Sequence, residues 1–391
     1  MRKILGLLCA SIIALTSIGA SAETIKPKAQ SSETIELGTR YTVHSNILGE
    51  DREILVRLPE GYEESDKRYP VVYLTDGGSH FSYTTLMASV LEEEGRMPHS
   101  IFVGIVNADT RGRDLLTHKD NFRRYIQDEV FSFINGNFRT SDIRTIYGGS
   151  MGGVFVLEIL ADHRDMFANY ITASAGPRGA LIKKFENHFA ANVEFDQTVY
   201  FTMTERGEEG ASGFNGANNL AALFEEKAPK SLKWRYDFIG GEVHMTTPIP
   251  TLYTGLSHAF RDYQAPTFNS SEDFESAGGM QVLEALFSNR ANKYGGDPEV
   301  PEQVRSRLGR LYFEENNREK AFAILEENAR LNPDNIGAYE TLGSIYYYAD
   351  RPENAIEAFK KGRALADAQG VPNMIEFFER GIRYSENKLA Q

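Results

Sequence analysis

The 391-residue chain contains a single cysteine, Cys9, and a single tryptophan, and its 42 Lys and Arg residues are outnumbered by 55 Asp and Glu residues. One cysteine cannot form an internal disulfide, and it cannot supply the clustered thiolates of a structural metal site. The formal net charge of −13 argues against general binding to nucleic acid or to an anionic membrane surface. The hydrophobic core must therefore stabilise the fold. The length is ample for such a core and predicts two domains.

The chain begins with the pattern of a secretory signal peptide. Arg2 and Lys3 form a basic start, an apolar run extends from Ile4 to Leu15, and a small-residue cleavage site ends at Ala22. Cleavage there would leave 369 residues with a formal charge of −15, because both basic residues leave with the signal. It would also remove Cys9, and with it any thiol nucleophile. The sequence therefore predicts a soluble periplasmic or secreted protein, since no later apolar run is long enough to span a membrane.

Residues 35–267 follow the pattern of an α/β domain, after a flexible lead-in at residues 23–34. Two alternating segments near the start predict an antiparallel edge pair. Short, nearly continuous apolar runs then predict parallel strands buried on both faces; they lie at residues 70–75, 101–106, 143–148, 170–174, 199–203 and 234–239. Helical stretches alternate with these runs, at residues 122–138, 152–161, 217–227 and 249–260. The predicted fold is a doubly wound, mostly parallel sheet covered by helices.

A linker is expected at residues 268–301, with one short helix from Met280 to Phe287. The sequence after this linker repeats itself at a spacing of 34 residues. Four positions recur at this spacing, as Leu308/Leu342, Gly309/Gly343, Tyr312/Tyr346 and Ala321/Ala355. Small residues where two helices touch, at this period, are typical of tetratricopeptide repeats. The sequence predicts a small all-α domain at residues 302–391, with repeats at 302–335 and 336–369 and a capping helix from Pro372 to Leu389. Because two repeats alone would be marginal, we expect them to pack on the α/β domain or on another copy.

A glycine-rich turn at residues 148–153 follows the buried strand that ends near Tyr147. A serine on a sharp strand-to-helix turn takes strained backbone angles, and glycines at 148 and 152 avoid steric clashes there. The pattern predicts Ser150 as a nucleophile at the start of a helix, with the N–H of Met151 placed to donate to an oxyanion. A glycine turn used only for packing is the alternative; a phosphate-binding loop is weaker still, because no Gly-Lys-Ser/Thr follows.

A nucleophilic serine needs a base, and in α/β-hydrolases the chain order is serine, acid, histidine. Four histidines follow Ser150. His163 comes at the end of a predicted helix, His188 lies in an amphipathic stretch, and His258 falls within a helix. Only His244 follows directly after a buried strand, in a loop shaped by two glycines. We therefore predict His244 as the base.

The triad acid is expected just beyond the strand at residues 199–203, in a loop with three glutamates. Glu208 and Glu209 rank above Glu205, which is close enough to the strand end to pair with Arg206 or to face solvent. The acid fixes the imidazole tautomer and stabilises the imidazolium that forms during the reaction. The choice between Glu208 and Glu209 stays open.

A second oxyanion donor is expected from the loop after the strand at residues 70–75. Glycines in that loop let the backbone approach a substrate closely, and Gly77 or Gly78 would supply the N–H group. We expect Asp76 to brace the loop rather than to take part in the chemistry.

Four segments together resemble the putative esterase family: Pro70–Gly78, Asn107–Leu115, Gly148–Gly153 and Gly241–His244. This family groups esterase D, enterochelin-esterase-like and siderophore esterases, feruloyl esterases and mycolyltransferases, all of them α/β-hydrolases. The resemblance covers about residues 35–265. It implies that Ser150 is the nucleophile, that His244 is the base, and that the acid lies in the loop of Glu208 and Glu209. Family members often have Thr-Pro after the second segment, and this chain does not. Arg111 and Arg113 are expected to be salt-bridge partners.

The leading hypothesis is a secreted or periplasmic serine carboxylic-ester hydrolase that forms an acyl-enzyme, on a small-molecule ester such as a siderophore lactone, a polysaccharide-linked ester or a small acyl ester. The alternatives are an acyltransferase of the same fold, or a partner-binding protein whose repeats matter and whose hydrolase domain is vestigial. No His-Glu-x-x-His motif and no dinucleotide loop occurs, so no metal or organic cofactor is expected. The repeats suggest a protein partner or self-association.

Overall fold

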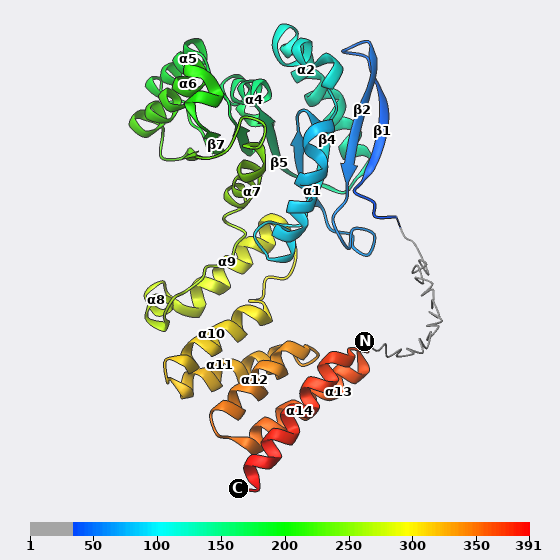
Figure 1. Cartoon of the computed structure of the whole chain (residues 1–391), viewed down its shortest axis with the longest axis vertical. Coiled ribbons are helices and arrows are strands. Elements are labelled where there is room, and N and C mark those ends of the chain that lie inside the picture. The colour runs from blue at the N-terminus through cyan, green and yellow to red at the C-terminus, as the bar shows by residue number, and fades with distance from the viewer. Residues whose placement is uncertain (1–33) are drawn as a thin grey trace, which may run out of the picture. The chain divides into compact units, whose positions relative to one another are not determined.

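A computed structural model describes residues 34–391 (Figure 1), and the predicted signal peptide lies outside these residues. Its centre is an eight-stranded sheet in the order β1-β2-β4-β3-β5-β6-β7-β8. The strands are β1 Thr39–Ser45, β2 Glu50–Arg57, β3 Tyr69–Leu74, β4 Ile101–Ile105, β5 Thr140–Gly149, β6 Asn169–Ala173, β7 Thr198–Met203 and β8 Lys233–Phe238. β1 and β2 form the antiparallel edge, and β3 to β8 run parallel to one another.

Both faces of the central strands are buried, and alternate residues of each strand point to opposite faces. The prediction that residues 234–239 are buried on both faces is wrong, because β8 is the edge strand and has no neighbour on one side. In β3, Val71 and Tyr73 join the hydrophobic cluster of one face, whereas Val72 and Leu74 join that of the other. Helices cover both faces: α1 Gly77–Glu93 and α7 Pro248–Ala259 pack on the second cluster, and the helices that contribute to the first include α4 Met151–Asp162, α5 Gly179–Ala190 and α6 Arg206–Lys227. The predicted doubly wound α/β fold is confirmed.

A broken helical segment connects β4 to β5. It contains α2 Lys119–Arg124 and α3 Phe131–Asn137, with short 3₁₀ or π-helical turns at Ala108–Thr110, Arg113–Thr117 and Tyr125–Val130. Residues 122–138 were predicted as one helix, and the structure shows a helical course with a π-helical stretch in it.

Three segments that were not predicted as helices are helical. Residues 77–93 form α1 despite the Gly-Gly start, because Phe81, Ala88 and Leu91 bury an apolar face against the sheet. Residues 179–190 form α5, and residues 206–210, which hold the candidate acids, form the first turn of α6 rather than a loop. Burial of an apolar face overrides the weak local helix propensity in α1 and α5, whereas the first turn of α6 is mostly exposed.

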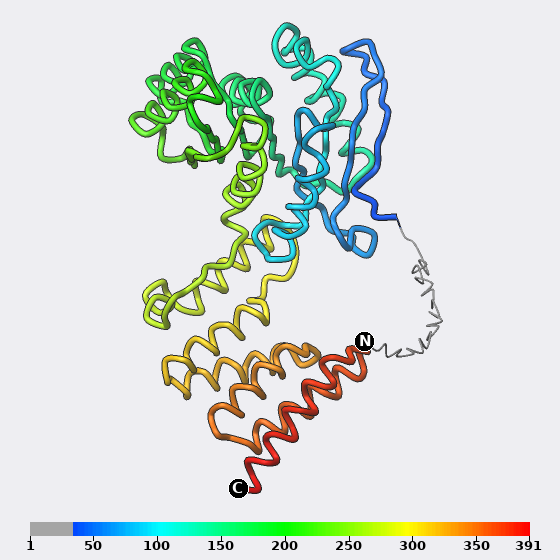
Figure 2. The backbone as a smooth tube through the Cα atoms, in the orientation of Figure 1, coloured from blue at the N-terminus to red at the C-terminus, as the bar shows by residue number. Residues whose placement is uncertain are grey.

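The C-terminal part is a series of helices (Figure 2). They are α8 Ser271–Ser276, α9 Gly279–Tyr294, α10 Glu302–Glu314, α11 Arg318–Leu331, α12 Ile336–Tyr348, α13 Pro352–Ala368 and α14 Pro372–Leu389. A Cβ atom added to Gly309 would lie 2.4 Å from the side chain of Leu325, and one added to Gly343 would lie 2.4 Å from Phe359. The predicted helix pairs and the close contact at their glycines are therefore confirmed. Within the described residues, no helix is both long enough and apolar enough to cross a bilayer.

The first repeat packs on the two helices that precede it, in the segment expected as a linker. Phe274 of α8 and Phe287 of α9 share a hydrophobic cluster with Leu308 and Tyr312. The end of α9 in turn contacts the α/β part, since the Tyr294 hydroxyl donates to Asp262 Oδ1 at 2.7 Å. The first repeat is therefore connected to the α/β part through α8 and α9.

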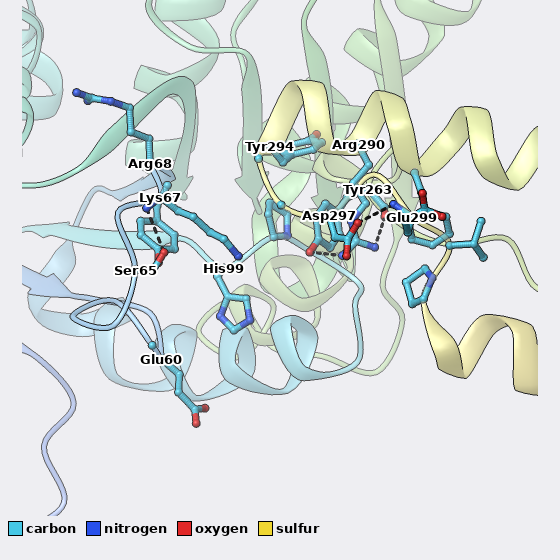
Figure 3. Close-up of a pocket in the computed structure, with 18 of the residues that line it drawn as sticks. Glu60, Ser65, Lys67, Arg68, His99, Tyr263, Arg290, Tyr294, Asp297 and Glu299 are labelled. Atoms are coloured by element: carbon cyan, nitrogen blue, oxygen red, sulfur yellow. Dashed lines mark hydrogen bonds between the residues drawn. The ribbon is translucent and has the colours of Figure 1, made fainter. Parts of the chain in front are cut away.

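A cavity of about 420 Å³ lies beside this contact (Figure 3). It is lined by Lys67 and His99 from the α/β part and by Arg290 and Tyr294 from α9, among others. None of the site residues predicted from the sequence lines it.

Candidate active site

Ser150 forms the turn between β5 and α4. Its backbone angles are φ 56° and ψ −118°, a conformation that a residue with a side chain adopts only when the surrounding structure enforces it. The N–H of Ser150 donates to the carbonyl of Ala173 at 2.8 Å, which fastens the turn to the end of β6. The strained serine predicted from the glycine-rich motif is therefore present, partly exposed at the carboxyl edge of the sheet.

The glycines of this turn are required by close packing. A Cβ on Gly148 would lie 2.3 Å from the carbonyl oxygen of Gly152, and a Cβ on Gly152 would lie 2.7 Å from Thr75 Oγ1. Both distances are shorter than any real contact. The expectation that positions 148 and 152 must be glycine is confirmed.

His244 and Glu209 form a partly buried hydrogen-bonded pair beyond the ends of neighbouring strands. His244 follows β8 and Glu209 follows β7, and His244 Nδ1 lies 2.8 Å from Glu209 Oε2. The side chain of Glu209 is 4% exposed and that of His244 is 33% exposed. This hydrogen bond raises the pKa of His244, although burial of the ring opposes the effect and the carboxylate charge adds to it.

The other two candidate acids do not bond to His244. Glu208 is exposed on the first turn of α6, and only its charge acts on the histidine. Glu205 accepts a long hydrogen bond of 3.4 Å from the N–H of Gly241. Of the three glutamates, Glu209 is the one whose side chain forms a hydrogen bond with His244.

Gly210 interrupts the helical backbone directly after Glu209. It has φ 68° and ψ 160° inside α6, a region that is open essentially to glycine alone. We expect Gly210→Ala to lower kcat/KM for an ester by about tenfold to a hundredfold, since small misplacements of a catalytic group cost that much. The protein should stay folded, because a Cβ at this position would meet no atom within 4 Å and the backbone strain of one such residue costs only about 1–3 kcal/mol.

The matched control is Gly207→Ala, three residues earlier in the same turn. Gly207 has no positive φ, and its Cβ would also meet nothing within 4 Å. Steady-state kinetics with thermal melts of both variants check the prediction. Equal activity of the two variants would show that the backbone at Gly210 does not set the position of Glu209.

The candidate oxyanion donors lie on the first turns of two helices. Met151 begins α4 and Gly77 begins α1, and the N–H groups of a first helical turn have no carbonyl partner within the helix. Gly77 packs so closely that a Cβ there would lie 2.4 Å from the backbone of Gly104, whereas Gly78 is exposed. Gly78 is therefore the more accessible of the two alternatives.

These side chains and N–H groups share one edge of the sheet. Gly78, Ser150, Glu209 and His244 follow β3, β5, β7 and β8, and the carboxyl ends of parallel strands lie together. Within residues 34–391, no hydrogen bond joins Ser150 Oγ to His244. Catalytic hydrogen bonds of this kind commonly tighten when substrate binds.

The remaining histidines after Ser150 lie elsewhere. His163 follows the end of α4, and His188 lies on α5. His258 lies on α7, where burial is the main cause that lowers its pKa to about 4. Across the described part of the chain, no group of three His, Cys, Asp or Glu side chains could hold a metal ion.

Sequence reasoning missed one residue that shapes this edge. Asn107 is buried directly after β4, and its Oδ1 accepts the N–H of Asp76 at 2.9 Å. Asp76 itself has φ 52° and starts α1, so this bond helps to fix the turn that carries Gly77 and Gly78. Asn107 begins the second segment of the family resemblance, but the sequence does not show its contact with Asp76.

The sheet and its helices are those of an α/β-hydrolase. An IroE-like serine hydrolase from Shewanella oneidensis shares the fold with a TM-score of 0.58 and 22% identity, over 75% of this chain and 99% of that chain. An uncharacterised protein from Capnocytophaga ochracea has a TM-score of 0.61 and 16% identity, over 83% of this chain and 93% of that chain.

The chain belongs to the putative esterase family, whose model matches residues 45–247. Residues 336–362 match a tetratricopeptide repeat, in the second of the two repeats predicted above. Among characterised proteins, the ferri-bacillibactin esterase BesA of Bacillus subtilis is 23% identical over 232 residues, which cover 49% of this chain and 78% of BesA. The protein is accordingly a hydrolase of an esterase family with a C-terminal repeat region.

Proposed function

We propose that the protein is a serine-type carboxylic-ester hydrolase with Ser150 as nucleophile, His244 as general base and Glu209 as the acid of the triad. The observation that carries this proposal is the 2.8 Å hydrogen bond between His244 Nδ1 and the buried carboxylate of Glu209. It lies at the same edge of the sheet as the strained turn of Ser150. A strained serine, a buried carboxylate and a histidine, in this order along the chain, are the parts of a hydrolase triad.

In this mechanism Ser150 Oγ attacks the ester carbonyl while His244 Nε2 takes its proton. The N–H of Met151, together with that of Gly77 or Gly78, donates to the oxygen of the tetrahedral intermediate. The alcohol leaves with the proton from His244, and water then attacks the acyl-enzyme by the same route.

Glu209 holds the imidazole in the tautomer whose Nε2 is free to accept a proton. Its carboxylate accepts a hydrogen bond from Nδ1–H and stabilises the imidazolium that forms as Ser150 attacks. Because the Glu209 side chain is almost completely buried, water competes little for this hydrogen bond.

We propose siderophore or polysaccharide-linked esters as the substrate class. The name of the B. subtilis relative, ferri-bacillibactin esterase, supports the first of these. The test is a hydrolysis screen with three kinds of ester: siderophore lactones, aromatic or acetyl esters of polysaccharide, and p-nitrophenyl esters of short acids. Turnover of p-nitrophenyl acetate without turnover of either larger class would refute the substrate proposal and leave the serine mechanism standing.

We also propose export to the periplasm or beyond, on the support of the signal-like pattern of residues 1–22. Mass spectrometry of the protein from a fractionated host should find the mature chain starting at Glu23. An intact Met1 in cytosolic material would contradict export.

A protein partner, or a second copy of this chain, is proposed for the helices α10–α14, with support from the repeat match. Sedimentation of the full chain across a range of concentrations tests self-association directly.

A further inference from the structure

Arg111 connects the two segments that carry the candidate oxyanion donors. Its Nε donates to Asp76 Oδ1 at 2.9 Å, and its Nη2 donates to the carbonyl of Gly149 at 3.2 Å. Asp76 precedes Gly77 at the start of α1, and Gly149 precedes Ser150 at the start of the nucleophile turn. One planar guanidinium therefore spans both sides of the site, which its fixed fork of donors allows.

The bond to Gly149 acts on the strained angle of Ser150. The peptide unit between Gly149 and Ser150 is held at both ends, because its N–H donates to Ala173 and its carbonyl accepts from Arg111. Because that peptide unit is fixed, φ of Ser150 depends only on the direction in which the chain continues after the Ser150 Cα atom. A conformation at φ 56° persists only when its surroundings over-determine it, and Arg111 is one of those surroundings.

The segment that carries Arg111 is anchored on its other side. Asp114 is buried and accepts from Arg52 Nη2 at 2.7 Å and from Thr110 Oγ1 at 2.6 Å. Arg113 pairs with Glu50 and with Asp114, and its hydrogen bonds lower the pKa of Glu50 to about 2. Arg111 and Arg113 are thus both salt-bridged, as expected from the sequence, but only Arg111 touches the nucleophile turn.

We infer that Arg111 is a positioning residue that holds the nucleophile turn and the first turn of α1 in register, so that Met151 and Gly77 or Gly78 can donate to one oxyanion. This inference rests on the proposed serine esterase function. Because Arg111 acts through Asp76 and the Gly149 carbonyl, its loss lowers the rate of the chemical step rather than the affinity for a small ester.

The test compares Arg111→Met with Arg113→Met, both measured with p-nitrophenyl acetate. Loss of one oxyanion donor costs about a hundredfold or more in kcat, so loosening the donor pair should cost about tenfold to a hundredfold. We expect this loss in Arg111→Met with KM within about threefold of the wild type. Arg113→Met should stay within about twofold, because Arg52 and Thr110 still hold Asp114.

Two further variants separate positioning from substrate contact. Asp76→Asn should lower kcat in the same way as Arg111→Met. The double variant should have about the kcat of the slower single variant, because both changes break the same Arg111–Asp76 contact. A substrate-binding arginine would instead show a raised KM and additive losses with Asp76→Asn, which would overturn the inference. Circular dichroism melts identify any variant that fails to fold. If Arg111→Met does not fold, Arg111→Lys replaces it and should also lower kcat, because an ammonium group cannot bridge the Asp76 carboxylate and the Gly149 carbonyl.

The pH profile adds a readout that a merely structural residue would not move. Glu209 and Glu208 raise the pKa of His244, whereas the charge of Arg111 lowers it. The acidic limb of kcat/KM should therefore move to higher pH in Arg111→Met and stay in place in Arg113→Met. A wild type without turnover would refute the proposed function and this inference together; an active wild type with an unchanged Arg111→Met refutes the inference alone.

Discussion

Replacing Ser150 by alanine is expected to lower kcat for p-nitrophenyl acetate by about a million-fold, the size of loss that serine hydrolases suffer without their nucleophile. The change removes only Oγ, and no covalent acyl-enzyme can then form. The turn itself should persist, because its shape depends on the N–H bond to Ala173 and on the glycines around it. Initial-rate kinetics and a thermal melt of the variant check both parts of the prediction.

The control for this experiment is Ser141→Ala. Ser141 lies near the other end of β5, so the change removes a serine hydroxyl from the same strand without touching the site. The control should hydrolyse the ester at the wild-type rate. If folded Ser150→Ala kept more than about one hundredth of the wild-type rate, the reaction could not depend on the serine.

The second large effect is expected from Glu209→Gln. An amide in place of the carboxylate can present an N–H to His244 Nδ1, which selects the wrong tautomer, and triads lose about 10⁴-fold in kcat in this way. The same change should move the acidic limb of kcat/KM to lower pH. The base must be neutral to accept a proton, and the hydrogen bond from Glu209 is the main cause that raises the pKa of His244. Without it, His244 becomes neutral at a lower pH.

Glu208→Gln is the matched control, one residue away on the same helical turn. Glu208 is exposed and acts on His244 only through its charge, which surrounding water screens. Its kcat should stay within about threefold of the wild type, with the acidic limb nearly unmoved. If Glu208→Gln were the slow variant and Glu209→Gln the active one, Glu209 would not be the triad acid.

The places of Ser150 and His244 after β5 and β8 could be predicted from the sequence because each depends on local signals. The glycines around Ser150 are demanded by atoms within a few residues or on adjacent strands, and His244 follows a recognisable strand, although β8 lies partly exposed at the edge of the sheet. The acid could not be chosen in the same way. Glu205, Glu208 and Glu209 differ mainly in direction, and that direction is set by the turn of α6 and its kink at Gly210.

The helices that were missed show the same limit. α1 begins with two glycines and contains several serines and threonines, so its sequence carries a weak helical signal; burial of Phe81 and Leu91 on the sheet decides its structure. The segment at residues 268–301 was expected to be a linker, yet α8 and α9 bury Phe274 and Phe287 against the first repeat. These outcomes depend on partners that are distant in the sequence, and local patterns do not report them.

The central claim is that Ser150 is the nucleophile activated by His244. A fluorophosphonate reacts covalently with an activated serine, and peptide mapping by mass spectrometry locates the adduct. We predict a single adduct on Ser150 in the folded wild type, and much slower labelling in His244→Ala. A folded protein that is not labelled at Ser150, or that is labelled equally fast without His244, would contradict the account.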